Sequence, residues 1–254
     1  MSGEVLYEVR DGAAWIMINR PEARNALNRA VREGLKAAFL RAEADPAAAV
    51  VVLTAAGDKA FCAGGDLKEM ADVGLTIPPP DYVPQPNRTV EVTKPVVAAV
   101  NGGAFGGGFL LAQSADLVIA AESARFGISE IKIGRGAPWA APLPWLVPPR
   151  IAMQMLVTGD PITARRAYEV GLVNEVVPLP ELAGRTTELV ATIAANAPLS
   201  VRAGKKMVYA VAEHSRSDAF DVAERIWEPV YLSEDAQEGP RAFAEKRKPL
   251  WRGR

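Results

Sequence analysis

Histidine and cysteine are almost absent from this sequence of 254 residues, which has one of each, His214 and Cys62. A metal site built from several His or Cys ligands, or a catalytic triad with a histidine base, would have to use that one histidine. His214 ends a helical pattern far along the chain from the glycine-rich segments, so we expect it at the surface. We predict no metal site, and chemistry carried by carboxylates and backbone N–H groups.

One cysteine cannot form an internal disulfide, which fits a reducing compartment. Cys62 has no basic neighbour in the sequence to favour its thiolate, so we expect a small packed residue. No apolar stretch reaches 18 residues, and the start Met-Ser-Gly-Glu-Val lacks the basic and apolar regions of a signal peptide. We expect a cytoplasmic protein with no membrane partner.

Charge of one sign is not in excess, because the net charge is only −1. Nucleic-acid-binding domains usually carry a basic stripe or a high isoelectric point, so no nucleic acid partner is expected. Apolar residues make up 49% and charged residues 23% of the chain, which is ordinary for a globular protein. The length allows one large core, or a core with a helical extension.

Short strands and helices alternate over the first part of the chain. Residues 5–9 and 14–18, separated by Asp11-Gly12, predict a hairpin. Asn28 offers an N-cap to a helix at 29–44. The apolar runs 50–54, 96–100 and 117–120 are typical of buried strands, and their recurrence between helices indicates an α/β architecture. Later segments predict one strand, 173–177, and helices at 151–158, 163–170, 181–196, 198–213, 217–231 and 234–246.

Two glycine-rich segments carry the strongest functional pattern, Phe61-Cys-Ala-Gly-Gly-Asp66 and Gly106-Gly-Gly108. Glycines after an apolar strand and before a helix let backbone N–H groups approach a ligand closely. No acidic residue completes a dinucleotide fingerprint, no Gly-Lys-Ser/Thr follows a glycine run, and Gly-x-Ser-x-Gly does not occur. Two such loops can form an oxyanion hole.

These motifs, together with residues 18–27 and 238–249, resemble the crotonase superfamily, the enoyl-CoA hydratase and isomerase family, over nearly the whole chain. The resemblance implies an α/β crotonase (ClpP-like) spiral of ββα units in residues 1–196. It also implies a helical C-terminal oligomerisation region in residues 197–254, and a homotrimer or a dimer of trimers. The implied substrate is a coenzyme A thioester, with no prosthetic group.

The family's site residues carry over position by position. Gly65 and Gly107 are the implied oxyanion-hole donors, and Ala63 and Asp66 lie where relatives hold the adenine half of coenzyme A. Arg24 is implied to meet the phosphates, and Ala26 to line the same pocket.

The chain departs from the hydratase pattern at its catalytic acids. Hydratases of this family use two glutamates; here the first position is Leu110, and the second is retained as Glu130. We expect a raised pKa for Glu130 among apolar neighbours, which suits proton transfer. In retaining only the second glutamate, the chain resembles the Δ3,Δ2-enoyl-CoA isomerases.

Two proline-rich segments lie on either side of Gly106–Glu130 in the sequence. Residues 74–87 have five prolines in nine positions, which forbid a regular helix; we expect either a solvated linker or a border of the acyl pocket. Residues 134–149, which include Trp139, predict a stiff apolar wall of that pocket or a rigid loop under the core.

Three functions remain open. The favoured one is an isomerase-type double-bond shift through Glu130. The second is a hydratase or another acyl-CoA lyase that uses a substitute acid such as Glu69, Asp72 or Asp81, and the third is a non-catalytic acyl-CoA-binding protein.

Overall fold

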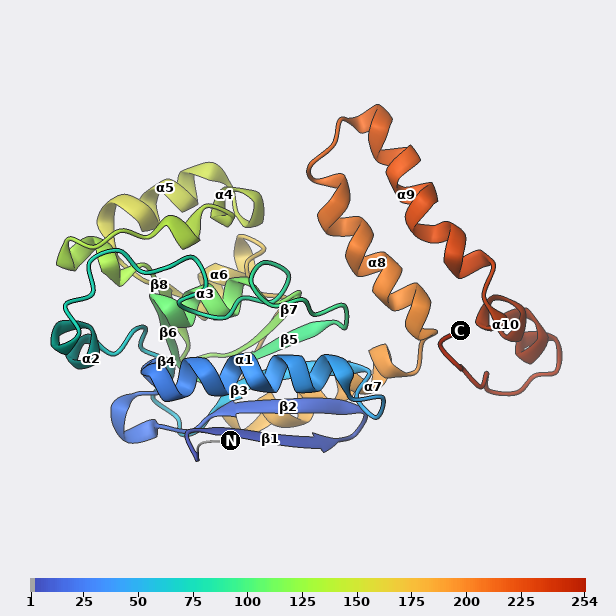
Figure 1. Ribbon diagram of the computed structural model, residues 1–254, viewed down its shortest axis with the longest axis horizontal. Coiled ribbons are helices and arrows are strands. Elements are labelled where there is room, and N and C mark those ends of the chain that lie inside the picture. The colour runs from blue at the N-terminus through green and yellow to red at the C-terminus, as the bar shows by residue number, and fades with distance from the viewer. Residues whose placement is uncertain (1–2) are drawn as a thin grey trace.

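The computed structural model describes residues 3–254; Met1 and Ser2, which belong to the predicted unit 1–196, lie outside the described residues. Two sheets form the body of the molecule (Figure 1). The six-stranded sheet has the order β1 (Val5–Arg10), β2 (Ala13–Ile18), β3 (Val50–Ala55), β5 (Val96–Val100), β7 (Leu117–Ala121), β10 (Glu175–Val177). The four-stranded sheet has the order β4 (Ala60–Cys62), β6 (Gly103–Phe105), β8 (Arg125–Gly127), β9 (Ile162–Thr163).

The chain advances by one strand in each sheet per turn, because β3, β5 and β7 of the large sheet are followed by β4, β6 and β8 of the small one. These strands pair in parallel, whereas β1–β2 and β8–β9 are antiparallel. α2 (Leu67–Asp72) and α3 (Gly107–Gln113) complete the first two turns. The predicted α/β spiral of ββα units is confirmed.

Apolar side chains fill both faces of the large sheet, as expected for buried parallel strands. α1 (Arg29–Ala44) covers one face with Val31, Leu35 and Phe39, all fully buried. The predicted N-cap is present, since the Asn28 side chain accepts a hydrogen bond from the Val31 N–H at 2.8 Å. α7 (Leu182–Ala194) contacts the other face.

The helices after residue 142 are those predicted, with ends shifted by a few residues and one short helix added. Besides α7, they are α4 (Leu143–Leu146), α5 (Pro149–Thr158), α6 (Ala164–Glu169), α8 (Pro198–Val211), α9 (Arg216–Tyr231) and α10 (Glu234–Ala244). Figure 1 shows α8 and α9 as an antiparallel pair that stands apart from the sheets, with α10 at the far end. His214 lies exposed just after α8, as expected. Of the helices in residues 3–254, none has the length and apolar character needed to cross a membrane.

The described residues also form the 3-10 turns η1 (Pro21–Ala23), η2 (Ser129–Ile133), η3 (Pro138–Ala140) and η4 (Leu179–Glu181). The segment 134–149, expected to be a rigid loop or wall, contains η3 and α4. Its prolines allow this because proline is well tolerated in the first turn of a helix. Residues 74–87 form no helix or strand, as their prolines predict.

Candidate active site

The two glycine segments meet because they follow β4 and β6, which are neighbours in the small sheet. Gly64 and Gly106 adopt positive φ angles of 101° and 53°, which side-chain-bearing residues rarely adopt. A Cβ atom on Gly64 would lie 3.5 Å from the backbone N of Gly107 and 3.1 Å from the carbonyl O of Phe105. The close approach of the loops therefore requires glycine.

The backbone N–H groups of Gly65 and Gly107 are free to bind a ligand. Neither donates to a protein acceptor within residues 3–254. Gly107 is the first residue of α3, where an N–H has no intrahelical acceptor. Both glycines line one cavity of about 430 Å³, so two donors are available to an oxyanion there.

Cys62 lies under these loops and is fully buried. Burial raises the pKa of its thiol to about 12, although a hydrogen bond from the Gly64 N–H opposes the rise. A Cβ atom on Gly108 would lie only 2.2 Å from the Cys62 carbonyl O. Cys62 is thus a packed, protonated residue, as predicted.

Glu130 presents one free carboxylate oxygen beside the glycine loops. Its Oε1 accepts a hydrogen bond from Trp139 Nε1 at 3.0 Å, and its Oε2 is buried with no partner within residues 3–254. A Cβ atom on Gly106 would lie 2.9 Å from Oε1. Burial raises the pKa of Glu130 above its ordinary value, and hydrogen bonds from its own backbone N–H and from Trp139 only partly offset the rise.

Trp139 is itself held from two sides. Its ring packs edge-on against Phe109, with centroids 5.8 Å apart and planes at 83°. Its carbonyl oxygen accepts a hydrogen bond from Gln113 Nε2 at 2.7 Å. The indole N–H is therefore fixed toward Glu130, so Trp139 orients the carboxylate as well as lining the cavity.

Among residues 3–254, Glu130 is the one acidic side chain that lines this cavity. Leu110, at the position where hydratases carry their first glutamate, also lines it and is only 3% exposed. None of the substitute acids suggested from the sequence lies in the wall. Asp72 and Asp81 are exposed, and Glu69 is paired with Arg32 at 3.1 Å.

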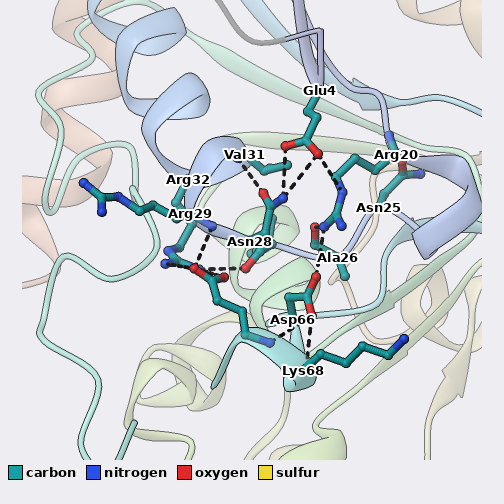
Figure 2. Close-up of polar contacts among 12 residues, drawn as sticks. Glu4, Arg20, Asn25, Ala26, Asn28, Arg29, Val31, Arg32, Asp66 and Lys68 are labelled. Atoms are coloured by element: carbon teal, nitrogen blue, oxygen red, sulfur yellow. Dashed lines mark hydrogen bonds and ion pairs between the residues drawn. The ribbon is translucent and has the colours of Figure 1, made fainter. Parts of the chain in front are cut away.

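The remaining predicted residues, Arg24, Ala26, Ala63 and Asp66, do not line the cavity. Figure 2 shows Ala26 and Asp66 beside Arg20. Arg20 forms ion pairs with Glu4 at 3.1 Å and Asp66 at 3.2 Å, and donates to the Ala26 carbonyl at 2.8 Å. Burial disfavours ionisation of Asp66, but hydrogen bonds from the Glu69 N–H and from Arg20 outweigh this effect and lower its pKa. Asp66 thus caps α2 and anchors the loop.

Arg24 also supports the loop through its backbone, because its carbonyl accepts a hydrogen bond from the Ala63 N–H at 3.1 Å. Its own side chain is exposed, and its φ of 51° is left-handed. The structure therefore brings Arg24 beside Ala63, with the guanidinium in solvent.

Two cavity residues, Met70 and Arg88, escaped the sequence analysis, because no motif marks them. Tyr82, Gln85 and Arg135 lie in the two proline-rich segments that were expected, as one alternative, to border the pocket, although no pattern singled them out. Residues 76–80, 82 and 83 of the proline-rich segment line the same wall, which agrees with a pocket border rather than a free linker. Within the described part of the chain, no group of three or more His, Cys, Asp or Glu side chains is placed to hold a metal ion.

Comparison with known proteins gives one consistent result. The sequence model of the enoyl-CoA hydratase/isomerase family matches residues 8–254. A carnitinyl-CoA dehydratase from Proteus mirabilis is 37% identical over the full length of both chains, and one from Salmonella agona is 38% identical over 99% of each. A probable enoyl-CoA hydratase/isomerase from Mycobacterium abscessus has a similar structure, with a TM-score of 0.89, 40% identity and full coverage of both chains. The crystal structure of an enoyl-CoA hydratase from Mycobacterium tuberculosis superposes with a TM-score of 0.90, at 40% identity and 99% coverage of each chain.

Proposed function

The chain belongs to the enoyl-CoA hydratase/isomerase family of the crotonase superfamily, and we propose that it moves a double bond in an enoyl-CoA thioester by proton transfer through Glu130. One observation carries the proposal. Glu130 Oε2 is buried and unpartnered in a cavity where no other described side chain is acidic, beside the free N–H groups of Gly65 and Gly107.

The proposed reaction starts with the thioester carbonyl accepting hydrogen bonds from Gly65 and Gly107. Glu130 Oε2 removes a proton from C2 of a 3-enoyl-CoA, and the electron pair delocalises onto the carbonyl oxygen as an enolate. Return of the same proton to C4 moves the double bond from C3–C4 to C2–C3, so atoms and charge balance. Each oxyanion donor is typically worth about 3 kcal/mol in such a transition state.

The environment of Glu130 supports this role. Burial raises its pKa, which lets the carboxyl group both take and return a proton. Trp139 engages Oε1 and leaves Oε2 for the substrate. The apolar Leu110 offers no second carboxylate to position water, which favours isomerisation over hydration.

Hydration or dehydration is the second candidate, because the similar curated proteins are named carnitinyl-CoA dehydratases. Glu130 alone would then have to exchange protons with both the carbon and the departing water, or an acid from outside the cavity would have to join it. Non-catalytic binding of acyl-CoA, the third possibility, gives no reason for an unpartnered buried carboxylate beside two free donors.

Two assays on the purified protein distinguish these reactions. We expect isomerisation of a 3-enoyl-CoA at a rate of at least several per second and slow hydration of crotonyl-CoA. Glu130→Gln should lose turnover by about 100-fold or more while it keeps ligand affinity, because the amide has nearly the same shape but cannot take the proton. Hydration of crotonyl-CoA at roughly 10 per second, faster than isomerisation, would overturn the preference.

Leu110→Glu tests the missing acid directly. A second carboxylate at this position should raise hydration relative to isomerisation, provided that the buried group ionises. Leu110→Gln is the matched control, since it has the same length but no acid. Equal hydration by the two variants would contradict the role assigned to Leu110.

A further inference from the structure

One part of the cavity wall has an excess of hydrogen-bond donors. Tyr82, Gln85, Arg88 and Arg135 all line it. Donors that face a cavity without protein acceptors are satisfied by a ligand or by water. Their chemistry therefore describes the group that they can bind.

Gln85 is a largely buried residue whose amide oxygen has a partner. The residue is only 6% exposed, and its side-chain Oε1 accepts a hydrogen bond from Arg88 Nη1 at 3.2 Å. Its backbone N–H donates to Thr89 Oγ1 at 2.8 Å. Because Oε1 is already engaged, Nε2 is the free end, and it has no acceptor within residues 3–254.

Arg88 and Arg135 bring positive charge to the wall, and neither forms an ion pair with an acidic side chain of residues 3–254. Arg20 and Arg32 each pair with a carboxylate, whereas Arg88 and Arg135 have no carboxylate within 4.0 Å in residues 3–254. Arg135 donates through both terminal nitrogens to the Leu75 carbonyl at 3.3 Å, and its Nη2 also donates to the Thr76 carbonyl at 3.3 Å. These bonds hold the guanidinium in place, and its Nε–H makes no hydrogen bond within residues 3–254.

Tyr82 adds a neutral donor to the same wall. The guanidinium carbon of Arg32 lies 4.0 Å from its ring centroid, and its hydroxyl makes no hydrogen bond within the described residues. With Glu130 as the one acid in the wall, the two guanidinium groups leave the cavity with net positive charge.

We propose that this wall binds an anionic group on the substrate's acyl chain, so that the preferred substrate is the CoA thioester of a dicarboxylic acid. The inference rests on the proposed binding of acyl-CoA and deepens it. A carboxylate accepts from several donors at once and pairs well with arginine. An alkyl chain would offer these donors no acceptor, and a quaternary ammonium group would meet like charge.

Isothermal titration with unreactive saturated thioesters tests this without depending on catalysis. Adipoyl-CoA and hexanoyl-CoA have six-carbon acyl chains and differ by a terminal carboxylate in place of a methyl group. We expect adipoyl-CoA to bind at least about tenfold more tightly than hexanoyl-CoA, with a preference that weakens at high salt. Equal affinities would overturn the proposal, and the proposed acyl-CoA function would stand. Binding of neither thioester would overturn both.

Arginine variants identify the group that provides the preference. Arg135→Gln and Arg88→Gln should reduce the adipoyl preference to within about threefold, mainly by weakening adipoyl-CoA. Arg165→Gln removes a guanidinium from α6 whose side chain is 76% exposed, and should change neither affinity. The second anionic source is the phosphates of coenzyme A itself. If the Arg135 and Arg88 variants weaken free CoA, hexanoyl-CoA and adipoyl-CoA equally, these arginines bind phosphate and the proposal is wrong.

Discussion

Glu130 combines two properties at the scale of the single residue: an oxygen held by Trp139 and an oxygen with no partner. The indole hydrogen bond favours the charged carboxylate, and burial favours the neutral acid. The balance sets the pH at which Glu130 becomes a base. A neighbouring side chain, rather than the carboxyl group alone, thus controls the proposed reaction.

Trp139→Phe should shift the acidic limb of the kcat/KM profile to higher pH. Loss of the hydrogen bond removes an interaction that lowers the pKa of Glu130, so the base form appears only at higher pH. Below the wild-type midpoint, we expect kcat/KM to fall by about tenfold, the value of a hydrogen bond to a charged group. Trp145→Phe, at a tryptophan that is 82% exposed, is the control. An unshifted profile with lower activity would mean that Trp139 only fills space.

Gly107→Pro should abolish an oxyanion donor while keeping the helix start, because proline is tolerated at the first position of a helix. We expect kcat/KM to fall by about 100-fold or more, as for other single oxyanion donors. A Cβ atom here would meet Leu27 Cδ1 at 2.8 Å, so crowding needs its own control. Gly107→Ala brings the same contact and keeps the N–H. If alanine costs as much as proline, crowding and not the donor explains the loss.

At the scale of the element, Asp116 fastens α8 to the large sheet. Its carboxylate accepts from the Val96 N–H at 2.7 Å, from Lys205 at 2.8 Å and from the Tyr209 hydroxyl at 2.7 Å. The side chains of Lys205 and Asp116 are only 8% and 14% exposed. Residues of α8, of α9 and of the segment 87–93 line a cavity of about 960 Å³ beside these contacts. The contacts of Asp116 therefore attach α8 to the sheet next to loosely filled space.

Asp116→Ala should lower the free energy of unfolding by about 3 kcal/mol, because it leaves the buried Lys205 ammonium without a carboxylate, with only the Lys94 carbonyl at 2.7 Å as acceptor. Urea denaturation followed by circular dichroism measures the change. Tyr209→Phe removes one hydrogen bond from the same carboxylate and should cost only about 1 kcal/mol. Equal small losses in both variants would show that α8 is held by apolar packing instead.

At the scale of the whole molecule, the C-terminal helices expose large apolar side chains. Phe220, Tyr231, Leu232 and Phe243 are each at least 66% exposed, and all lie in or next to α9 and α10. Apolar surface of this kind usually marks an interface. It supports the proposal that residues 197–254 form an oligomerisation unit.

We therefore predict a homotrimer, or a dimer of trimers, in solution. Light scattering at micromolar concentration should give three or six times the chain mass. Phe243→Glu, at the most exposed of these positions, should weaken assembly if α10 is buried between subunits, whereas Ile77→Glu, an equally exposed change outside the helical region, should not. A wild-type monomer would contradict the prediction.

The sequence by itself determined the α/β class, the strands of the large sheet, the glycine loops and the identities of Leu110 and Glu130, and the family resemblance implied the spiral of ββα units. Each of these features depends on residues that are neighbours in the sequence. Glycine suits a positive φ angle, and a short apolar run suits a buried strand. The strands β4, β6 and β8 were missed, because three residues are too few to show a pattern.

Only the tertiary structure decided which side chain bonds to Glu130 and which hydrogen-bond donors share its cavity. Trp139 reaches Glu130 through the turn between η2 and η3, and Arg135 crosses to the carbonyl of Leu75, 60 positions earlier. Such contacts depend on how the loops fold back over the sheets. The spacing of residues along the sequence does not show which loops come together. For the same reason the substitute acids Glu69, Asp72 and Asp81 were reasonable in sequence and lie outside the cavity wall in space.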